Sequence, residues 1–516
     1  MKKSFIIHPF LFAVFPILFL FAHNVGQVSF SEILLPTAIV LGFTLMLLLL
    51  ARLILKENKK AAVFVSFFLI VFFSYGHVFE GLLHWWLIGR ISLESLHTYL
   101  LLSWGILFIC GAYFIIRTRR DLHNVTNILN IMATFLVVIS LINIVPYKLK
   151  SRVVLQNIKS TENIRVNTLA SKKTDTLPDI YYIILDRYAS ASALKEAYNF
   201  DNSEFIDYLS TRGFYIASQS RANYPVTPHS LASSLNMEYI NYLSDKVGEE
   251  SDDWTPLYAM LQDYKVWRFL KARGYKFIHF GARWYPTSKN KYADINFNLP
   301  HSLESFPRLL YGTTMLWPID ARFNITEFAD YRLTQRKRIL YEFEELAEIP
   351  NIEDPTFVFA HMIIPHRPYV FDRYGNFPSK EEVDKRGKKK SYIEQLIFAN
   401  KKIEVLIDKL LSKSESPPII ILQADEGVYP QREIEGWKQA TKAELRQKMR
   451  ILNAYYLPHT DKNVLYPSIT PVNSFRLIFN LYFDTDFELL PDESYIFVDQ
   501  HHIYKFSNVT DIVGYN

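Results

Sequence analysis

The sequence IYYIILD at residues 180–186 and the sequence PIIILQADEG at residues 418–427 decide the fold of the second part of the chain. Each is a short, continuously apolar run that ends in acidic residues. Such runs are typical of parallel strands covered on both faces, and ligand sites in open α/β sheets lie at the carboxyl ends of these strands. We therefore expect Asp186, Asp425 and Glu426 to meet at one edge of one sheet. Acids at strand ends also begin ordinary solvated loops, but two such ends with an adjacent Asp-Glu pair favour a metal site.

Hydrophobic residues make up 49% of the 516, and they are concentrated in the first third of the chain. Five segments there are nearly free of charge and have about the 20 residues that a bilayer crossing needs. They are residues 4–21, 33–55, 61–83, 99–116 and 128–145. The first could instead be a signal peptide, but no small-x-small cleavage site follows it, so an uncleaved anchor is favoured.

Lysine and arginine residues set the expected orientation of these spans. They gather at Lys2 and Lys3, at residues 52–60 and at residues 117–120, which predicts that these segments face the cytoplasm. Five spans then place everything after Tyr147 on the outer side. We expect a transmembrane bundle of five helices over residues 1–147, a linker over 148–176 and one outer domain over 177–516.

The outer domain alternates strand-like and helix-like patterns, which predicts a doubly wound α/β fold. Expected strands cover residues 180–185, 213–217, 275–280, 356–362, 419–424 and 452–457, and helices cover 255–273, 331–347, 392–411 and 472–482. The net charge of +5 is modest, so nothing indicates a nucleic-acid partner. The single cysteine, Cys110, lies in the fourth span, so the outer domain has no disulfide and no thiol nucleophile.

A threonine precedes a predicted helix in the sequence YPVTPHSLASSLN at residues 224–236. Pro228 is suited to a first helical turn, which places Thr227 at or beside the N-cap. Thr227 could serve only as a cap. Its hydroxyl also stands where free backbone N–H groups hold an anion, and a nearby dication would lower its pKa and make it a nucleophile.

Two histidines occur in the sequence FAHMIIPHRPYVFD at residues 359–372. His361 follows apolar strand residues and could be a core histidine or a ligand. His366 lies in a loop between Pro365 and Pro368. We expect His366 to donate to a phosphoryl oxygen or to protonate a leaving group.

Together these motifs resemble the alkaline phosphatase superfamily, in its membrane-anchored, sulfatase-like branch of lipoteichoic acid synthases and phosphoethanolamine transferases. The family pattern has an acid after the first strand, a threonine before a helix, a His-x-x-x-x-His-x-Pro segment and a late Asp-His-Gly. Here these are Asp186, Thr227, the segment with His361 and His366, and Asp425-Glu426-Gly427. The resemblance covers essentially the whole chain, because spans, a linker and an outer domain follow in the same order.

The resemblance implies one divalent metal ion held by Asp186, Thr227, Asp425 and Glu426, with His361 and His366 contacting the phosphate. Glu426 replaces the usual histidine, and an all-oxygen shell favours Mn²⁺, or Mg²⁺ or Ca²⁺, over Zn²⁺. Lipoteichoic acid synthases also hold the head group with a tryptophan and an arginine. The sequence GARWYPT at residues 281–287 offers Arg283 and Trp284 for that role, or these residues simply pack and are solvated.

The activity implied is a membrane-bound phosphotransferase in a bacterial cytoplasmic membrane. It would move a phosphoglycerol or phosphoethanolamine head group from a phospholipid donor to an envelope glycan or lipid acceptor, through a phospho-threonine. A true sulfatase is disfavoured because Thr227 cannot become formylglycine and Leu231 stands where its signature arginine would fall. A phosphodiesterase, in which water replaces the acceptor, and a non-catalytic membrane-anchored binding module with the same fold are the alternatives.

Overall fold

The computed structural model describes residues 5–25, 28, 30–85, 93–162, 177–299, 305–323, 325–326, 330–430, 432, 434–460 and 462–515. The chain forms two compact units, residues 1–152 with 302–331 and residues 153–301 with 332–516. The sequence predicted one uninterrupted outer domain after the linker, whereas residues 302–331 join the first unit. Of the expected linker, residues 148–162 continue a helix, and residues 163–176 lie outside the described part of the chain.

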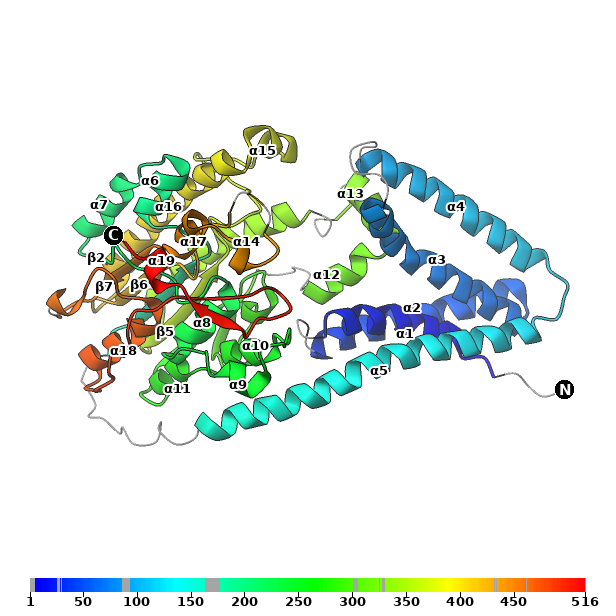
Figure 1. Cartoon of the computed structure of the whole chain (residues 1–516). Coiled ribbons are helices and arrows are strands. Elements are labelled where there is room, and N and C mark those ends of the chain that lie inside the picture. The colour runs from blue at the N-terminus through cyan, green and yellow to red at the C-terminus, as the bar shows by residue number, and fades with distance from the viewer. Residues whose placement is uncertain are drawn as a thin grey trace. The chain divides into compact units, whose positions relative to one another are not determined.

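Five apolar helices build the first unit (Figure 1). They are α1 (His8–His23), α2 (Phe30–Leu55), α3 (Asn58–Trp85), α4 (Leu93–Arg117) and α5 (His123–Glu162), and each covers one expected span. Among the described residues, the last four are long and apolar enough to cross a membrane. Helix α1 has 16 residues, which span about 24 Å against a hydrocarbon layer of about 30 Å. The structure thus supports four spans, and a crossing by α1 stays a prediction.

The apolar core of the first unit lies where α1, α2 and α3 pack together, around Ile17, Phe21, Val65 and Leu69. Two short helices, α12 (Ser305–Gly312) and α13 (Leu316–Phe323), belong to the same unit. Large apolar side chains of α2, α4 and α5 are exposed, among them Leu53, Phe114 and Ile131. Exposed apolar surface of this extent is what a helix presents to lipid.

A seven-stranded sheet forms the centre of the second unit, in the order β2-β7-β6-β1-β5-β3-β4. Its strands are β1 (Ile180–Leu185), β2 (Tyr215–Ile216), β3 (Lys276–Phe280), β4 (Ile295–Phe297), β5 (Thr356–Met362), β6 (Ile419–Gln423) and β7 (Asn453–Tyr456). Strands β6, β1, β5, β3 and β4 are parallel neighbours, and β7 runs antiparallel to β6 and β2. A separate antiparallel pair is formed by β8 (Tyr495–Phe497) and β9 (Phe506–Asn508).

The register of the central strands places their carboxyl ends side by side. Leu185 at the end of β1 pairs with Met362 at the end of β5, and Ile184 pairs with Gln423 at the end of β6. All side chains of these three strands are buried, as expected for continuously apolar strands between two layers. The residues that follow β1, β5 and β6 therefore meet at one edge.

Helices cover the sheet of the second unit (Figure 1). They are α6 (Ala191–Tyr198), α7 (Ser203–Thr211), α8 (Thr227–Asn236), α9 (Leu243–Val247), α10 (Thr255–Gln262), α11 (Lys265–Lys271), α14 (Tyr331–Leu346), α15 (Lys380–Arg386), α16 (Lys388–Lys413), α17 (Lys442–Met449), α18 (Pro471–Tyr482) and α19 (Thr510–Val513). Short 3₁₀ turns occur at Tyr285–Thr287, Ile349–Asn351, Trp437–Gln439 and Lys462–Val464. The helix expected over 255–273 is two helices, because the chain turns extended at Asp263 and Tyr264.

Candidate metal centre and active site

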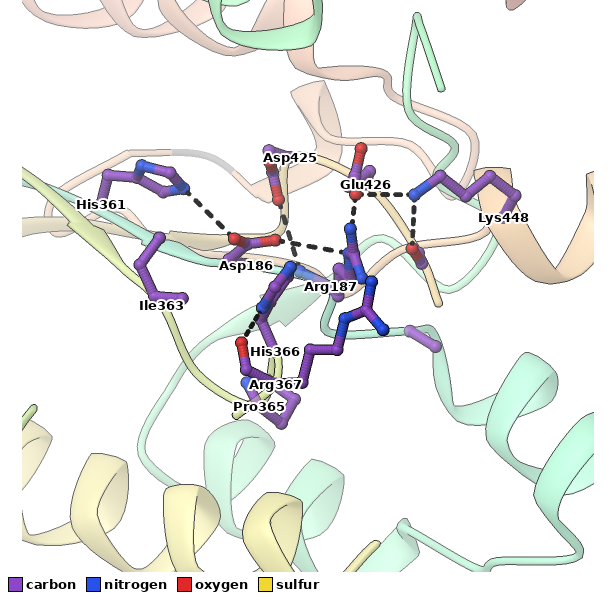
Figure 2. A network of polar contacts seen from close by, with 12 residues as sticks. Asp186, Arg187, His361, Ile363, Pro365, His366, Arg367, Asp425, Glu426 and Lys448 are labelled. Carbon is purple, nitrogen blue, oxygen red and sulfur yellow. Dashed lines mark hydrogen bonds and ion pairs between the residues drawn. The ribbon is translucent and has the colours of Figure 1, made fainter. Parts of the chain in front are cut away.

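Three buried carboxylates lie at the edge where β1 and β6 end (Figure 2). Asp186 directly follows β1, and Asp425 and Glu426 follow β6 after one residue. Because β1 and β6 are parallel neighbours, the two strand ends deliver their acids to the same place. Each residue has less than 5% of its surface exposed: Asp186 4%, Asp425 2% and Glu426 1%.

A possible metal site is formed by Asp186, His361 and Asp425. One ligand atom from each lies within 4.8 Å of the others. His361 reaches the acids from β5, the other neighbour of β1, and its Nε2 lies 3.9 Å from Asp186 Oδ2. Its Nδ1 lies 2.9 Å from the hydroxyl of Thr287, and when Nδ1 carries the proton, the lone pair on Nε2 faces the two acids.

Unpartnered buried atoms show that this cluster fits a cation. Within the described part of the chain, Asp186 Oδ1, His361 Nε2 and Asp425 Oδ2 are buried without a hydrogen-bond partner. Buried acceptors normally have partners, and three that converge are explained by an ion that accepts their lone pairs. Two carboxylates and one imidazole are ligands that both Zn²⁺ and Mn²⁺ take.

Burial and mutual repulsion shift the pKa values of these groups. The pKa of Asp186 is raised well above its ordinary value, by burial first and then by the charge of Asp425. Burial also raises the pKa of Asp425 and lowers the pKa of His361 to about 3. The imidazole is therefore neutral, and a bound dication would relieve the repulsion between the two carboxylates.

Thr227 is the first residue of α8, and its side chain lowers the pKa of Asp425 against the larger effect of burial, which raises it. The N-cap of α8 is Val226, which has extended backbone angles and no capping side chain, so Thr227 does not cap the helix as the sequence allowed. In the next turn, the Ser230 hydroxyl donates to the backbone oxygen of Asp425 at 2.6 Å. This contact holds the first turn of α8 against the loop that follows β6.

Glu426 contacts two cations through one of its carboxylate oxygens. Its Oε1 accepts from Arg187 Nε at 2.9 Å and from Lys448 Nζ at 2.6 Å. Its Oε2 is buried without a hydrogen-bond partner, like the ligand atoms of Asp186, His361 and Asp425. A role for Glu426 as a metal ligand therefore stays a prediction, and His361 offers a nitrogen ligand beside it.

Arg187 and Lys448 are candidate functional residues that the sequence reasoning missed. They lie on the ring of Tyr429, with Arg187 Cζ 4.0 Å and Lys448 Nζ 3.6 Å from its centroid. Burial lowers the pKa of Lys448 to about 8. Arg187 has a left-handed backbone conformation with φ 65°. This conformation is unusual for a residue other than glycine and often marks a functional position. Arg187 could have been found because it follows Asp186 directly, whereas no spacing rule indicates Lys448.

Gly427 allows α17, which carries Lys448, to approach the loop after β6. A Cβ atom on Gly427 would lie 2.5 Å from the Gln447 carbonyl oxygen, closer than such atoms approach. The Gly427 N–H donates to the Lys448 carbonyl at 2.7 Å, and Lys448 Nζ donates back to the Gly427 carbonyl at 3.2 Å. The glycine of the Asp-Glu-Gly sequence is therefore what brings Lys448 to Glu426.

His366 lies in the loop after β5, and backbone contacts fix its position. Its N–H donates to the Asp186 carbonyl at 3.2 Å, its carbonyl accepts from Gln395 of α16 at 2.8 Å, and its Nδ1 bonds to the Arg367 carbonyl. The pKa of His366 is lowered well below its ordinary value, by burial first and then by the charge of Arg187. A bound anion would oppose the second effect.

The tryptophan and arginine expected to hold a head group have different surroundings. The ring of Trp284 is half-buried and lies edge-on to the ring of His361, with centroids 6.0 Å apart. Arg283 is exposed. The structure brings Trp284 close to the cluster and leaves Arg283 at the surface.

The charges of the site favour a cation together with an anion. Three carboxylates face two cationic side chains, Arg187 and Lys448, which leaves one negative charge without a partner. A divalent ion would turn the balance positive. A negatively charged group could then be held between the ion, Arg187 and the start of α8, within reach of the Thr227 hydroxyl.

No protein-family model matches the chain, and no curated protein sequence matches it. Several solved structures are similar to it. The zinc complex of the C-terminal periplasmic domain of EcEptC from Escherichia coli has 12% identity and a TM-score of 0.43, over 67% of this chain and 99% of that one. Lipooligosaccharide phosphoethanolamine transferase A from Neisseria meningitidis, an integral membrane protein, has 11% identity and a TM-score of 0.38, over 92% of this chain and 95% of that one. A putative sulfatase from Bacteroides thetaiotaomicron has 13% identity and a TM-score of 0.35, over 59% and 70% of the two chains.

Proposed function

We propose that the chain is a membrane-bound, metal-dependent phosphotransferase that takes a phosphorylated head group from a phospholipid onto Thr227 and passes it to an envelope glycan or lipid. One observation carries this proposal. Helix α8 begins at Thr227 and is bonded through Ser230 to Asp425, whose unpartnered Oδ2 belongs to a cluster of buried ligand atoms. A hydroxyl beside an otherwise unexplained cation site is the arrangement that activates an oxygen nucleophile.

In the first half-reaction, Thr227 Oγ would attack the phosphorus of the donor. The bond from phosphorus to the diacylglycerol oxygen breaks as the bond to Thr227 Oγ forms, and diacylglycerol leaves after taking up a proton. Asp425, whose pKa the Thr227 side chain lowers, would accept the hydroxyl proton of Thr227 and so direct the oxygen lone pair at the phosphorus. The divalent ion, when bound, would lower the pKa of that hydroxyl and stabilise negative charge on the phosphoryl oxygens.

Positive groups would stabilise the charge that develops on the phosphoryl oxygens. The Arg187 side chain is 17% exposed, whereas that of Lys448 is fully buried, so Arg187 is the better placed to touch substrate. Lys448 would act through Glu426 by holding this carboxylate, and hence Arg187, in place. The substrate's negative charge would raise the pKa of His366, which could then protonate the leaving oxygen.

The apolar helices supply a reason for the donor to be a membrane lipid. The α2–α3 loop carries Lys56 and the α4–α5 loop carries Arg119 and Arg120, and cationic loops of this kind face the cytoplasm. Because α5 runs away from such a loop, the second unit would lie on the extracytoplasmic side whether or not α1 crosses the bilayer. A phospholipid head group would then be presented to the site from the outer leaflet.

Two alternatives follow from the same site. If water replaced the acceptor, the protein would be a phosphodiesterase, and if it bound ligand without turnover, it would be a non-catalytic binding module.

The test is to incubate the purified full-length protein with labelled phosphatidylethanolamine or phosphatidylglycerol and Mn²⁺ or Zn²⁺, and to measure diacylglycerol. We expect diacylglycerol from the wild type and none from Asp186→Asn. Release without any acceptor would identify a hydrolase. No diacylglycerol with any lipid or metal, from folded protein, would refute the proposal.

A further inference from the structure

Helices α12 and α13 interrupt the sequence of the second unit, yet they pack into the first. Residues 302–331 are grouped with the membrane helices, and Phe306 and Leu310 of α12 are buried in the core around α1, α2 and α3. The turn at residues 313–315 joins the two helices into a helical hairpin (Figure 1). The chain therefore returns from the second unit to the membrane unit and leaves it again.

Two backbone hydrogen bonds attach the turn of this hairpin to α3. The Gly76 N–H donates to the Thr313 carbonyl at 2.9 Å, and the Met315 N–H donates to the Phe72 carbonyl at 3.2 Å. In an α-helix the N–H of residue 76 and the carbonyl of residue 72 are partners in one backbone hydrogen bond. The turn of the hairpin therefore bonds to both the donor and the acceptor of that helical position.

The absence of a side chain at position 76 makes this contact possible. A Cβ atom there would lie 2.6 Å from the Gly312 carbonyl oxygen and 2.6 Å from Thr313 Cα, both backbone atoms that cannot move aside alone. A Cβ atom on Gly81, five residues later in α3, would have no neighbouring atom within 4 Å. Packing therefore requires a glycine at position 76 and not at position 81.

The polar groups of the turn are satisfied inside the hairpin. The Thr313 hydroxyl donates to the Leu310 carbonyl and the Thr314 hydroxyl donates to the Tyr311 carbonyl, each at 2.7 Å, so the last carbonyls of α12 have partners. The Tyr311 hydroxyl donates to Asp320 of α13 at 2.7 Å. Away from water an unpaired backbone group destabilises by several kcal/mol, and a non-helical turn survives at membrane depth only when protein satisfies it.

The position of Gly76 along α3 places the turn below the membrane surface. Lys59 and Lys60 mark the cytoplasmic end of α3, and Gly76 comes 16 residues after Lys60. That separation is about 24 Å along a helix, within a hydrocarbon layer of about 30 Å. The turn would therefore sit inside the outer leaflet.

The other face of the hairpin presents large apolar side chains. Leu309 is 44%, Leu316 is 47% and Phe323 is 72% exposed. The spanning helices of the same unit expose large apolar side chains as well, among them Leu53 and Phe114. Acyl chains of the surrounding bilayer are the occupant that this chemistry fits, because the hairpin packs on the membrane helix α3.

We propose that residues 305–323 form a re-entrant helical hairpin that enters the outer leaflet, is locked to α3 at Gly76 and packs its free face against lipid acyl chains. It anchors the second unit to the membrane at a point far in sequence from α5. The chain runs from the hairpin into α14, whose Arg332, Gln335 and Arg336 donate to the carbonyls of Tyr369, Ile363 and Val370. In sequence, the hairpin thus directly precedes the helix that holds the His366 loop.

Photo-crosslinking to lipid tests this proposal in the full-length protein. p-Benzoylphenylalanine would replace Leu309, Leu316 or Phe323 in nanodiscs of phosphatidylethanolamine and phosphatidylglycerol, and adducts would be identified by mass spectrometry. Tyr374 is the control, since it is 78% exposed on the second unit. We expect lipid adducts at the three hairpin positions and none at position 374. No adduct at the hairpin positions, or equal adducts at position 374, would overturn the proposal.

The glycine lock has a matched pair of variants. Gly76→Leu should expel the turn, with loss of the lipid adduct at position 309 and faster amide hydrogen exchange at Thr313 and Met315. Gly81→Leu, in the same helix, should leave both unchanged. If the two variants give the same crosslinks and the same hydrogen-exchange rates, the contact at Gly76 does not hold the turn in place. Should Gly76→Leu fail to fold, the crosslinks in the unaltered background still decide whether the hairpin lies in lipid.

Discussion

Replacing Lys448 by methionine tests the assignment of Glu426 to an ion pair. Lys448 Nζ lies 2.6 Å from Glu426 Oε1, and both side chains are buried, with 0% and 2% exposed. Breaking a buried pair destabilises by about 3–5 kcal/mol, because one charge is left without its partner. Arg187 still contacts Glu426 at 2.9 Å, so we expect about 3 kcal/mol. At about 2 °C per kcal/mol for a large domain, the melting temperature of the second unit should fall by about 6 °C.

The same substitution should strengthen metal binding. Lys448→Met removes one positive charge beside Asp186 and Asp425, so a dication meets a more negative site and gains affinity. A ligand that binds only the folded state raises the melting temperature in proportion to the logarithm of its affinity. Added Mn²⁺ should therefore raise the melting temperature of Lys448→Met more than that of the wild type. The double variant Lys448→Met, Glu426→Gln should regain only part of the lost stability, because Arg187 then keeps only its 4.0 Å contact with Asp186.

The assay is thermal unfolding of the full-length protein in nanodiscs, with and without EDTA. Hydrogen exchange of the β1 and β6 peptides assigns the transition to the second unit. Lys413→Met is the matched control, since Lys413 pairs with Glu348 at 2.9 Å but the side chains are 37% and 53% exposed. An exposed pair of this kind contributes about 0–1 kcal/mol. A Lys448→Met protein that melts like Lys413→Met, or that gains no more from Mn²⁺ than the wild type, would refute the reasoning.

Three further predictions concern the nucleophile, the metal and the orientation. Thr227→Ala should abolish diacylglycerol release while reducing stability by at most about 1.5–3 kcal/mol, the range for a hydrogen bond to a charged group, and Thr227→Ser should retain part of the activity. Wild-type turnover by the alanine variant would exclude the phospho-threonine. His361→Asp should shift the bound metal, measured by elemental analysis, from Zn²⁺ toward Mn²⁺. Glu426→His should change the bound metal little. A larger shift in Glu426→His than in His361→Asp would instead make residue 426 a metal ligand. In a Cys110→Ala background, Tyr374→Cys should react with a membrane-impermeant thiol reagent in intact cells, and reaction only after lysis would reverse the orientation.

The sequence predicted the parts of the fold that depend on local patterns. Continuous apolar runs located β1, β5 and β6, because a strand buried on both faces needs apolar residues at every position. The acids after β1 and β6 followed from the rule that parallel strands end at a common edge. Strand β4 and the β8–β9 pair were missed, since three-residue strands carry too little pattern to be recognised.

Contacts between segments distant in sequence could not be predicted in the same way. Lys448 comes 22 residues after Glu426 on a helix of unremarkable composition, and its role depends on how closely Gly427 lets α17 approach. The hairpin of α12 and α13 was assigned to the outer domain because its helices have 8 residues each, far fewer than a bilayer crossing needs. Its membership of the first unit depends on the space beside Gly76 and on the burial of Phe306 and Leu310 in the core of that unit.

His361 offers a nitrogen ligand that the motif at residues 425–427 does not predict. The pattern that the chain resembles has a histidine directly after the late aspartate, and Glu426 at that position predicted an all-oxygen shell. In the structure Glu426 lies between Arg187 and Lys448, whereas His361 of the adjacent strand directs an unpartnered Nε2 at Asp186. The carboxylate at position 426 offsets the charge of two cations, so a histidine there would leave both without a counter-ion. Metal preference should therefore follow residue 361, and the residue at position 426 should instead set how strongly the site binds an anion.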